Sequence, residues 1–143
     1  MVTLNTNSTA HRIIETTQEL IQTLGYNAIS FNDIAELVGI KKPSIVHHFP
    51  NKAALVVAVV NHYRDTYSTL LTKVCNGPNS STMDAFDAFC TPYISFAASE
   101  GEVCLCGALA GEYRALPTSV QSEVTRFFKD SLTVARRSIN SRM

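Results

Sequence analysis

Apolar side chains in the first part of the chain recur at the spacing of a helix. Between residues 8 and 24 they stand three and four positions apart, which places them on one face of an amphipathic helix. The residues on that face are Ala10, Ile13, Ile14, Thr17, Leu20, Ile21 and Leu24. Gly25 is expected to end the helix, because glycine adopts helix-closing conformations without steric cost. No stretch of the sequence alternates polar and apolar residues as a strand would, so the pattern predicts an all-α fold.

A second helix is predicted to begin at Ser30. Ser30 and Asp33 form an S-x-x-D arrangement, in which the two side chains satisfy free N–H groups at a helix start. The apolar face of this helix consists of Phe31, Ile34, Ala35 and Val38. Gly39 follows and is expected to end the helix in the left-handed conformation.

A third helix, too short to stand alone, is predicted directly after this glycine. Pro43 suits its first turn, and Ile45, Val46 and Phe49 are the residues left to anchor it. A short helix that presents Lys, Ser and His side chains beyond a glycine turn is typical of a helix-turn-helix motif that enters the DNA major groove.

The rest of the chain predicts four more helices. Asn51 is expected to cap the first, which spans residues 52–74 and is apolar on every side in its first half, as in a buried helix. Residues 76–81 are dense in turn formers and mark the clearest break in the chain. The later helices are expected around residues 86–97, at about 103–114 and from 118 to the end of the chain. Pro92 is expected to kink or interrupt the first of these three.

A longer run of residues, from Gly25 to Leu55, carries a family resemblance. The residues concerned are Gly25-Tyr26, Ser30 to Ile34, Ala35, Gly39-Ile40, His48-Phe49, Asn51-Lys52 and Leu55. This run resembles the DNA-binding domain of the tetracycline-repressor (TetR) family of transcriptional regulators. It departs from the family pattern at Lys41, where a serine cap is usual, and at Val46, where a phosphate-binding tyrosine is usual.

The resemblance implies two domains. Residues 1–50 would form a three-helix, homeodomain-like helix-turn-helix domain that binds DNA. Residues 51–143 would form a partial TetR-type helical domain for ligand binding and dimerisation, which lacks the family's last helices. The helix over residues 52–74 would connect the two domains.

The residues expected to contact DNA lie on and beside the third helix. They are Ser30, Asn32, Lys41, Lys42, Ser44, His47 and Lys52. Side chains at the start of the third helix reach base edges, while Lys52 combines its charge with the free N–H groups of a helix start. The phosphate contacts of Ser30 and Asn32 are implied by the resemblance. The alternative, an ordinary solvated face of lysines, is disfavoured by the glycine turn and the flanking matches; for His48 a packing role is preferred.

Composition refines this picture only slightly. Lys plus Arg and Asp plus Glu number 12 each, so any basic surface must be local. The longest apolar run, residues 53–60, is far shorter than the roughly 20 residues that span a bilayer. The N-terminus has no basic and apolar signal pattern, so a cytoplasmic location without a membrane partner is expected.

Cys104 and Cys106 permit two special roles and one ordinary role. They could form half of a metal site, but zinc sites use four ligands and no second Cys or His pair lies nearby, so no metal or cofactor is expected. They could also sense oxidants or electrophiles, as cysteines do in some TetR-family regulators. Apolar surroundings and acidic neighbours raise the pKa of a thiol, so small buried core residues are the favoured interpretation.

An effector pocket is implied by the resemblance, because the family builds one between the helices of the second domain. The candidate lining residues are Phe89, Tyr93, Leu109, Tyr113 and Phe127. Residues of this kind at helical spacing also form ordinary core, and the sequence does not separate the two.

The function expected from these patterns is regulation of transcription and not catalysis. The sequence has no glycine-rich phosphate loop, no H-E-x-x-H motif and no nucleophile elbow. We expect a ligand-responsive repressor that binds a palindromic double-stranded DNA operator as a homodimer and responds to a small-molecule effector. The alternatives are a cysteine-based redox or electrophile sensor of the same fold and a truncated DNA-binding remnant without regulation.

Overall fold

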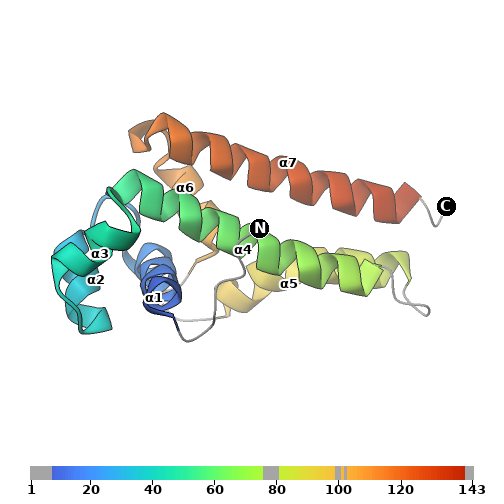
Figure 1. Cartoon of the computed structure of the whole chain (residues 1–143). Helices are drawn as coiled ribbons and strands as arrows, with labels where there is room; N and C mark the ends of the chain where they lie inside the picture. The colour runs from blue at the N-terminus through green and yellow to red at the C-terminus, as the bar shows by residue number, and fades with distance from the viewer. Residues whose placement is uncertain (1–7, 76–80, 99–100, 102, 141–143) are drawn as a thin grey trace.

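The computed structural model describes residues 8–75, 81–98, 101 and 103–140, and within them every regular element is a helix. The elements are α1 (Thr9–Leu24), α2 (Phe31–Val38), α3 (Lys42–His48), α4 (Lys52–Cys75), α5 (Thr82–Ala97), α6 (Leu105–Gly111), the 3-10 helix η1 (Tyr113–Ala115) and α7 (Thr118–Asn140). The long helices α4 and α7 run along the molecule, with α1 to α3 gathered at one end and α5 beside the other end of α4 (Figure 1). The predicted all-α fold is confirmed.

Local hydrogen bonds set the boundaries of the first two helices where the sequence predicts them. The Ser8 hydroxyl accepts the N–H of His11 at 3.1 Å at the start of α1. Gly25 ends that helix with a φ of 84°, in the region that favours glycine. Ser30 and Asp33 form the reciprocal capping box at the start of α2. These three predictions are confirmed.

The helix α4 is the one around which the others pack. The side-chain oxygen of Asn51 accepts the N–H of Ala54 at 2.8 Å, which confirms the predicted cap. α4 contacts α1, α5, α6 and α7. Its fully buried core positions are Leu55, Val56, Val59 and Val60. Burial of such side chains stabilises the fold by about 1.5–3 kcal/mol each.

Beyond this apolar half, α4 and α7 are joined by aromatic rings and an ion pair. The buried ring of Phe127 lies between those of Tyr63 and Tyr67, with centroid separations of 5.4 and 5.6 Å. Arg64 and Glu123 form an ion pair at 3.1 Å. One continuous core runs from α1 to α7, so the domain boundary predicted between residues 50 and 51, in the link from α3 to α4, stays a prediction.

One boundary in the second half differs from the prediction. The helix α5 continues through Pro92 to Ala97, so the proline does not interrupt it, and the predicted kink stays a prediction. The helix expected at about 103–114 is shorter, since the backbone N–H of Val103 donates to the Gln22 carbonyl instead. That helix gives way to η1 after Gly111.

Candidate nucleic-acid interface

The helix α3 places its polar residues on the surface and is fixed by few apolar ones. Lys41, Lys42, Ser44 and His47 are all exposed, as the sequence predicts for residues that reach DNA. Ile45 is fully buried and Phe49 is half-buried, so these two side chains anchor the helix. Val46, expected to be a third anchor, is 43% exposed, because it points away from the core on so short a helix.

The position of α3 is set by the turn that precedes it. Gly39 adopts the left-handed conformation with a φ of 78°, and its N–H donates to the Ala35 carbonyl at 2.9 Å. Arg12 of α1 donates through Nη2 to the carbonyl of Val38 at 2.6 Å. This guanidinium satisfies a carbonyl at the end of α2 that the helix itself leaves unpaired. The sequence analysis missed Arg12, because only the fold brings α1 to this turn.

The predicted contacts at the edges of α3 have mixed surroundings. Asn32 is exposed on α2. The hydroxyl of Ser30 is already engaged, since it donates to the Asp33 carboxylate at 2.7 Å and accepts the Asp33 N–H at 3.3 Å. His48, expected to pack, is exposed, and its ring lies edge-on to that of His47 at 5.3 Å. The DNA contacts themselves stay a prediction.

Lys52 is less exposed than the other residues predicted to contact DNA. Its ammonium donates to the carbonyl of Tyr26 at 2.5 Å and lies 4.1 Å from the centroid of the Tyr26 ring. Burial lowers the pKa of Lys52, and the negative charge of Glu112 opposes this effect. Its role as a phosphate contact stays a prediction, but in the structure Lys52 braces the turn between α1 and α2.

Glu112, a residue distant in sequence, also binds this turn. Its two carboxylate oxygens accept the backbone N–H groups of Tyr26 at 2.6 Å and of Asn27 at 3.2 Å. Burial, and secondly the charge of Glu112, raises the pKa of Tyr26. A Cβ atom on Gly25 would lie 2.8 Å from this carboxylate, so a larger residue there would push the carboxylate away from the turn. This contact was not predicted, because Glu112 lies 86 and 85 positions from its two partners in the sequence.

The candidate effector residues that the structure describes have different surroundings. Leu109 and Phe127 are fully buried in the core, and Phe89 is half-buried against it. The Tyr113 hydroxyl lies at the surface, 3.2 Å from that of Thr125. The side chain of Tyr93 is outside the described part of the chain. Their common role as a pocket stays a prediction.

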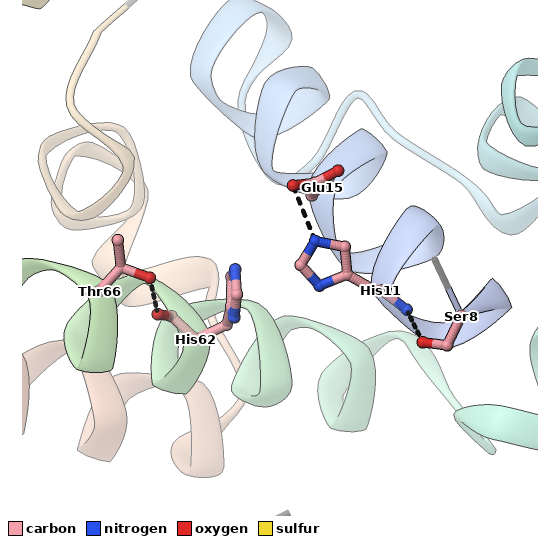
Figure 2. Close-up of polar contacts among 5 residues, drawn as sticks. All are labelled: Ser8, His11, Glu15, His62 and Thr66. Carbon is pink, nitrogen blue, oxygen red and sulfur yellow. Dashed lines mark hydrogen bonds and ion pairs between the residues drawn. The ribbon is translucent and has the colours of Figure 1, made fainter. Parts of the chain in front are cut away.

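A cavity of about 510 Å³ lies instead between α1, α4 and α5. Its wall contains Glu15, Gln18, Glu19, His62, Tyr63, Thr66, Tyr67, Leu70, Thr91 and Ser95. Beside it, His11 of α1 meets His62 of α4 edge-on at 5.2 Å, and His11 pairs with Glu15 at 2.9 Å (Figure 2). The cavity is therefore shared by the reading unit (α1–α3), which contributes α1, and the C-terminal region, which contributes α4 and α5.

Both cysteines considered as sensors are buried. The Cys104 sulfur lies 3.5 Å from the Tyr63 hydroxyl. Burial, and secondly Cys104, raises the pKa of the Cys106 thiol well above its usual range, which disfavours the reactive thiolate. Across the residues that the structure describes, no group of three His, Cys, Asp or Glu could hold a metal ion, and no helix is long and apolar enough to cross a membrane.

Comparison with known proteins shows which family the chain resembles in sequence and in fold. The model of the family described as bacterial regulatory proteins, tetR family, matches residues 13–59. The crystal structure of a TetR transcriptional regulator from Legionella pneumophila is 31% identical, with a TM-score of 0.81, over 94% of this chain and 82% of that chain. A TetR-family regulator from Agrobacterium tumefaciens is 32% identical, with a TM-score of 0.80, over 96% of this chain and 74% of that chain.

A curated relative matches over a shorter region. The uncharacterized HTH-type transcriptional regulator YuxN of Bacillus subtilis is 35% identical over 71 residues, which are 49% of this chain and 24% of the relative. The match thus spans about a quarter of that relative's length. The structural similarities, by contrast, extend over nearly the whole chain and most of each regulator. The chain therefore belongs to the tetR family of bacterial regulatory proteins, a family of transcriptional regulators.

Proposed function

We propose that the protein is a ligand-responsive repressor that binds a palindromic DNA operator as a homodimer, with α3 as the helix that enters the major groove. The observation that carries the proposal is the exposed surface of α3, where Lys41, Lys42, Ser44 and His47 stand together on a helix anchored by Ile45. Lysine can donate to guanine O6 and N7, and serine and histidine can donate to bases or phosphates.

The absence of a global positive charge makes this local surface decisive. The chain has a formal net charge of zero, so attraction to DNA must come from the few cations at the start of α3. Asn32, on α2, is proposed to contact the phosphate backbone beside the same groove, and Ser30 would do so only by exchanging its hydrogen bond to Asp33 for one to a phosphate. Lys52 was predicted as a further phosphate contact, but its ammonium donates to the Tyr26 carbonyl, so we propose that it holds the turn between α1 and α2 and leaves the phosphate contacts to the other residues.

Dimerisation is proposed because one short reading helix covers only half of a palindromic site. Exposed apolar side chains on α5 and α7 are available for an interface between two copies. They include Phe86, Ile94 and Leu132, each more than half exposed. Size-exclusion chromatography tests this directly: a stable monomer would remove the dimer and leave the simpler model of an unregulated DNA-binding remnant.

The effector is proposed to bind in the cavity between α1, α4 and α5. The carboxylates of Glu15 and Glu19 on its wall suit a ligand with hydrogen-bond donors or a positive charge, and Tyr63 and Leu70 supply apolar surface. An effector weakens DNA binding only to the extent that it prefers a conformation that DNA does not. A cavity shared by α1 and α4 provides such a preference, because a ligand there separates or tilts the two helices.

The experiment that tests the DNA-binding surface is a titration of duplex DNA from the promoter region upstream of the protein's own gene. The double variant K41A/K42A is expected to bind at least about tenfold more weakly, with a salt slope smaller by about two. Lys129→Ala is the control, because Lys129 is also an exposed lysine but lies on α7, outside the helix-turn-helix. Equal affinity of both variants and the wild type would remove α3 as the reading helix.

A further inference from the structure

The C-terminal helices reach the turn between α1 and α2 through one carboxylate. Glu112, between α6 and η1, accepts the N–H groups of Tyr26 and Asn27, at 2.6 and 3.2 Å, on its two oxygens. The bonded residues are 86 and 85 positions apart in sequence, so the contact joins two distant parts of the chain. A carboxylate that accepts two neighbouring backbone N–H groups fixes both the position and the orientation of that backbone, and hydrogen bonds to a charged acceptor are the stronger kind.

A second pair of hydrogen bonds joins the same regions at the other end of α6. The N–H of Val103 donates to the Gln22 carbonyl at 3.1 Å, and Nε2 of Gln22 donates to the Val103 carbonyl at 3.2 Å. The helix α6 is therefore attached at both of its flanks to the last turn of α1 and to the turn that follows. A shift of α6 would move the end of α1 directly, without passing through α4.

Lys52 closes this arrangement on the other side of Tyr26. Its ammonium donates to the Tyr26 carbonyl, while Glu112 holds the Tyr26 N–H. Lys52 is also the first residue of α4, four positions after the last residue of α3. The carboxylate thus acts on both flanks of the helix-turn-helix: on the turn that leads into α2 and, through Tyr26, on Lys52 at the start of α4.

We propose that Glu112 is a positioning residue for DNA binding, which sets the angle of the helix-turn-helix against the C-terminal helices and passes displacements of α6 to it. This role rests on the proposed DNA binding by α3. Two reading helices must be about one turn of DNA apart, roughly 34 Å, so a small rotation of each unit misplaces α3 in its groove. Rigid attachment of the turn lowers the cost of holding the unit in the binding geometry.

The test compares Glu112→Gln with Glu123→Gln in the full chain. Glutamine keeps the size of the side chain but has no charge, and in the same orientation its NH2 group faces one of the two N–H donors that the carboxylate now binds. Glu123 is the matched control, because it is a partly buried carboxylate on α7 whose partner, Arg64, lies on α4 and away from the reading unit. With the promoter duplex as probe, E112Q is expected to bind about tenfold more weakly, the equivalent of 1.4 kcal/mol, and E123Q within about twofold of wild type.

Amide hydrogen exchange in the free protein gives the second readout. In E112Q the amides of Tyr26 and Asn27 are expected to exchange faster, while those of α7 are unchanged; E123Q is expected to leave Tyr26 and Asn27 unchanged. Unaltered exchange at these two amides in E112Q would overturn the contact. A loss of DNA affinity in E123Q equal to that in E112Q would overturn the positioning role in favour of general stability.

The same measurements separate this role from the proposed function. If wild-type protein fails to bind the promoter duplex, the proposed function falls and the positioning role falls with it. If wild type binds and E112Q binds equally well, only the positioning role of Glu112 is overturned.

Discussion

Lys42 and Lys52 belong to the same helix-turn-helix segment, yet the structure gives them different surroundings. Lys42 is exposed in the first turn of α3 and makes no hydrogen bond or ion pair within the described part of the chain. Lys52 is half-buried, donates to the Tyr26 carbonyl and has a lowered pKa, because burial outweighs the effect of Glu112. The first lysine is available to a partner, and the second belongs to the frame that holds the motif.

This difference shows that charge type and sequence position do not assign a role on their own. Both lysines follow a turn and stand at a helix start, where phosphate binding is a reasonable expectation. They differ in whether another segment of the chain packs over them. Lys42 has none, whereas the Tyr26 turn, held by Glu112 from the far end of the chain, covers Lys52.

The largest effect is expected from a change beneath the exposed surface. Ile45→Ala removes the one fully buried side chain of α3 and should lower the free energy of unfolding by about 3 kcal/mol, with loss of DNA binding. Val46→Ala, one residue further on, should change it by less than about 0.5 kcal/mol, because Val46 is exposed. Urea denaturation measures both. Similar losses for the two variants would mean that Val46 packs in solution.

The fold was largely predictable because local chemistry fixes most helix ends. Ser8, Ser30 and Asn51 act on N–H groups three residues ahead of them, and Gly25 and Gly39 close helices by their own backbone conformation. Such signals are visible within a few residues of sequence. The start of α6 was mispredicted, because there the Val103 N–H bonds to Gln22, a partner 81 positions away.

The candidate site was predictable only in part, for the same physical reason. Exposure of Lys41, Lys42, Ser44 and His47 follows from the apolar spacing of α3 and was expected. The pairing of Glu112 with the Tyr26 turn depends on how α6 packs against α1, which no local pattern contains. The contact of Arg12 with the end of α2 could not be predicted from the sequence either, since an arginine on the polar side of a helix has many potential partners.

A smaller effect separates the two lysines directly. Lys42→Met should lower the salt slope of DNA binding by about one and leave the free energy of unfolding unchanged. Lys52→Met should lower the free energy of unfolding by about 1 kcal/mol, the size of one lost hydrogen bond, and leave the salt slope nearly unchanged. The measurements are promoter-duplex titrations at several salt concentrations and urea denaturation. Equal reductions in slope would place Lys52 on a phosphate and contradict its assignment to the frame of the motif.

The smallest effect concerns the pH dependence of stability at the Tyr26 turn. Burial, and secondly the charge of Glu112, raises the pKa of Tyr26 above 10.0. The unfolded chain therefore loses this proton first, so the stabilising contribution is fully present below about pH 10 and is lost as pH rises through the folded pKa. Lys52 acts in the opposite direction, since its lowered pKa lets stability rise as pH approaches 10.5.

Tyr26→Phe isolates the tyrosine contribution. The variant should show a shallower fall in unfolding free energy between about pH 9 and pH 11 than wild type, because its side chain has no proton to lose. Glu112→Gln should give an intermediate fall, since it removes the charge that raises the pKa of Tyr26 but leaves the larger effect of burial. An identical pH dependence in all three proteins would show that Tyr26 titrates in the folded state as it does in the unfolded chain. The turn would then not be closed over its ring, and Lys52 would be as free as Lys42.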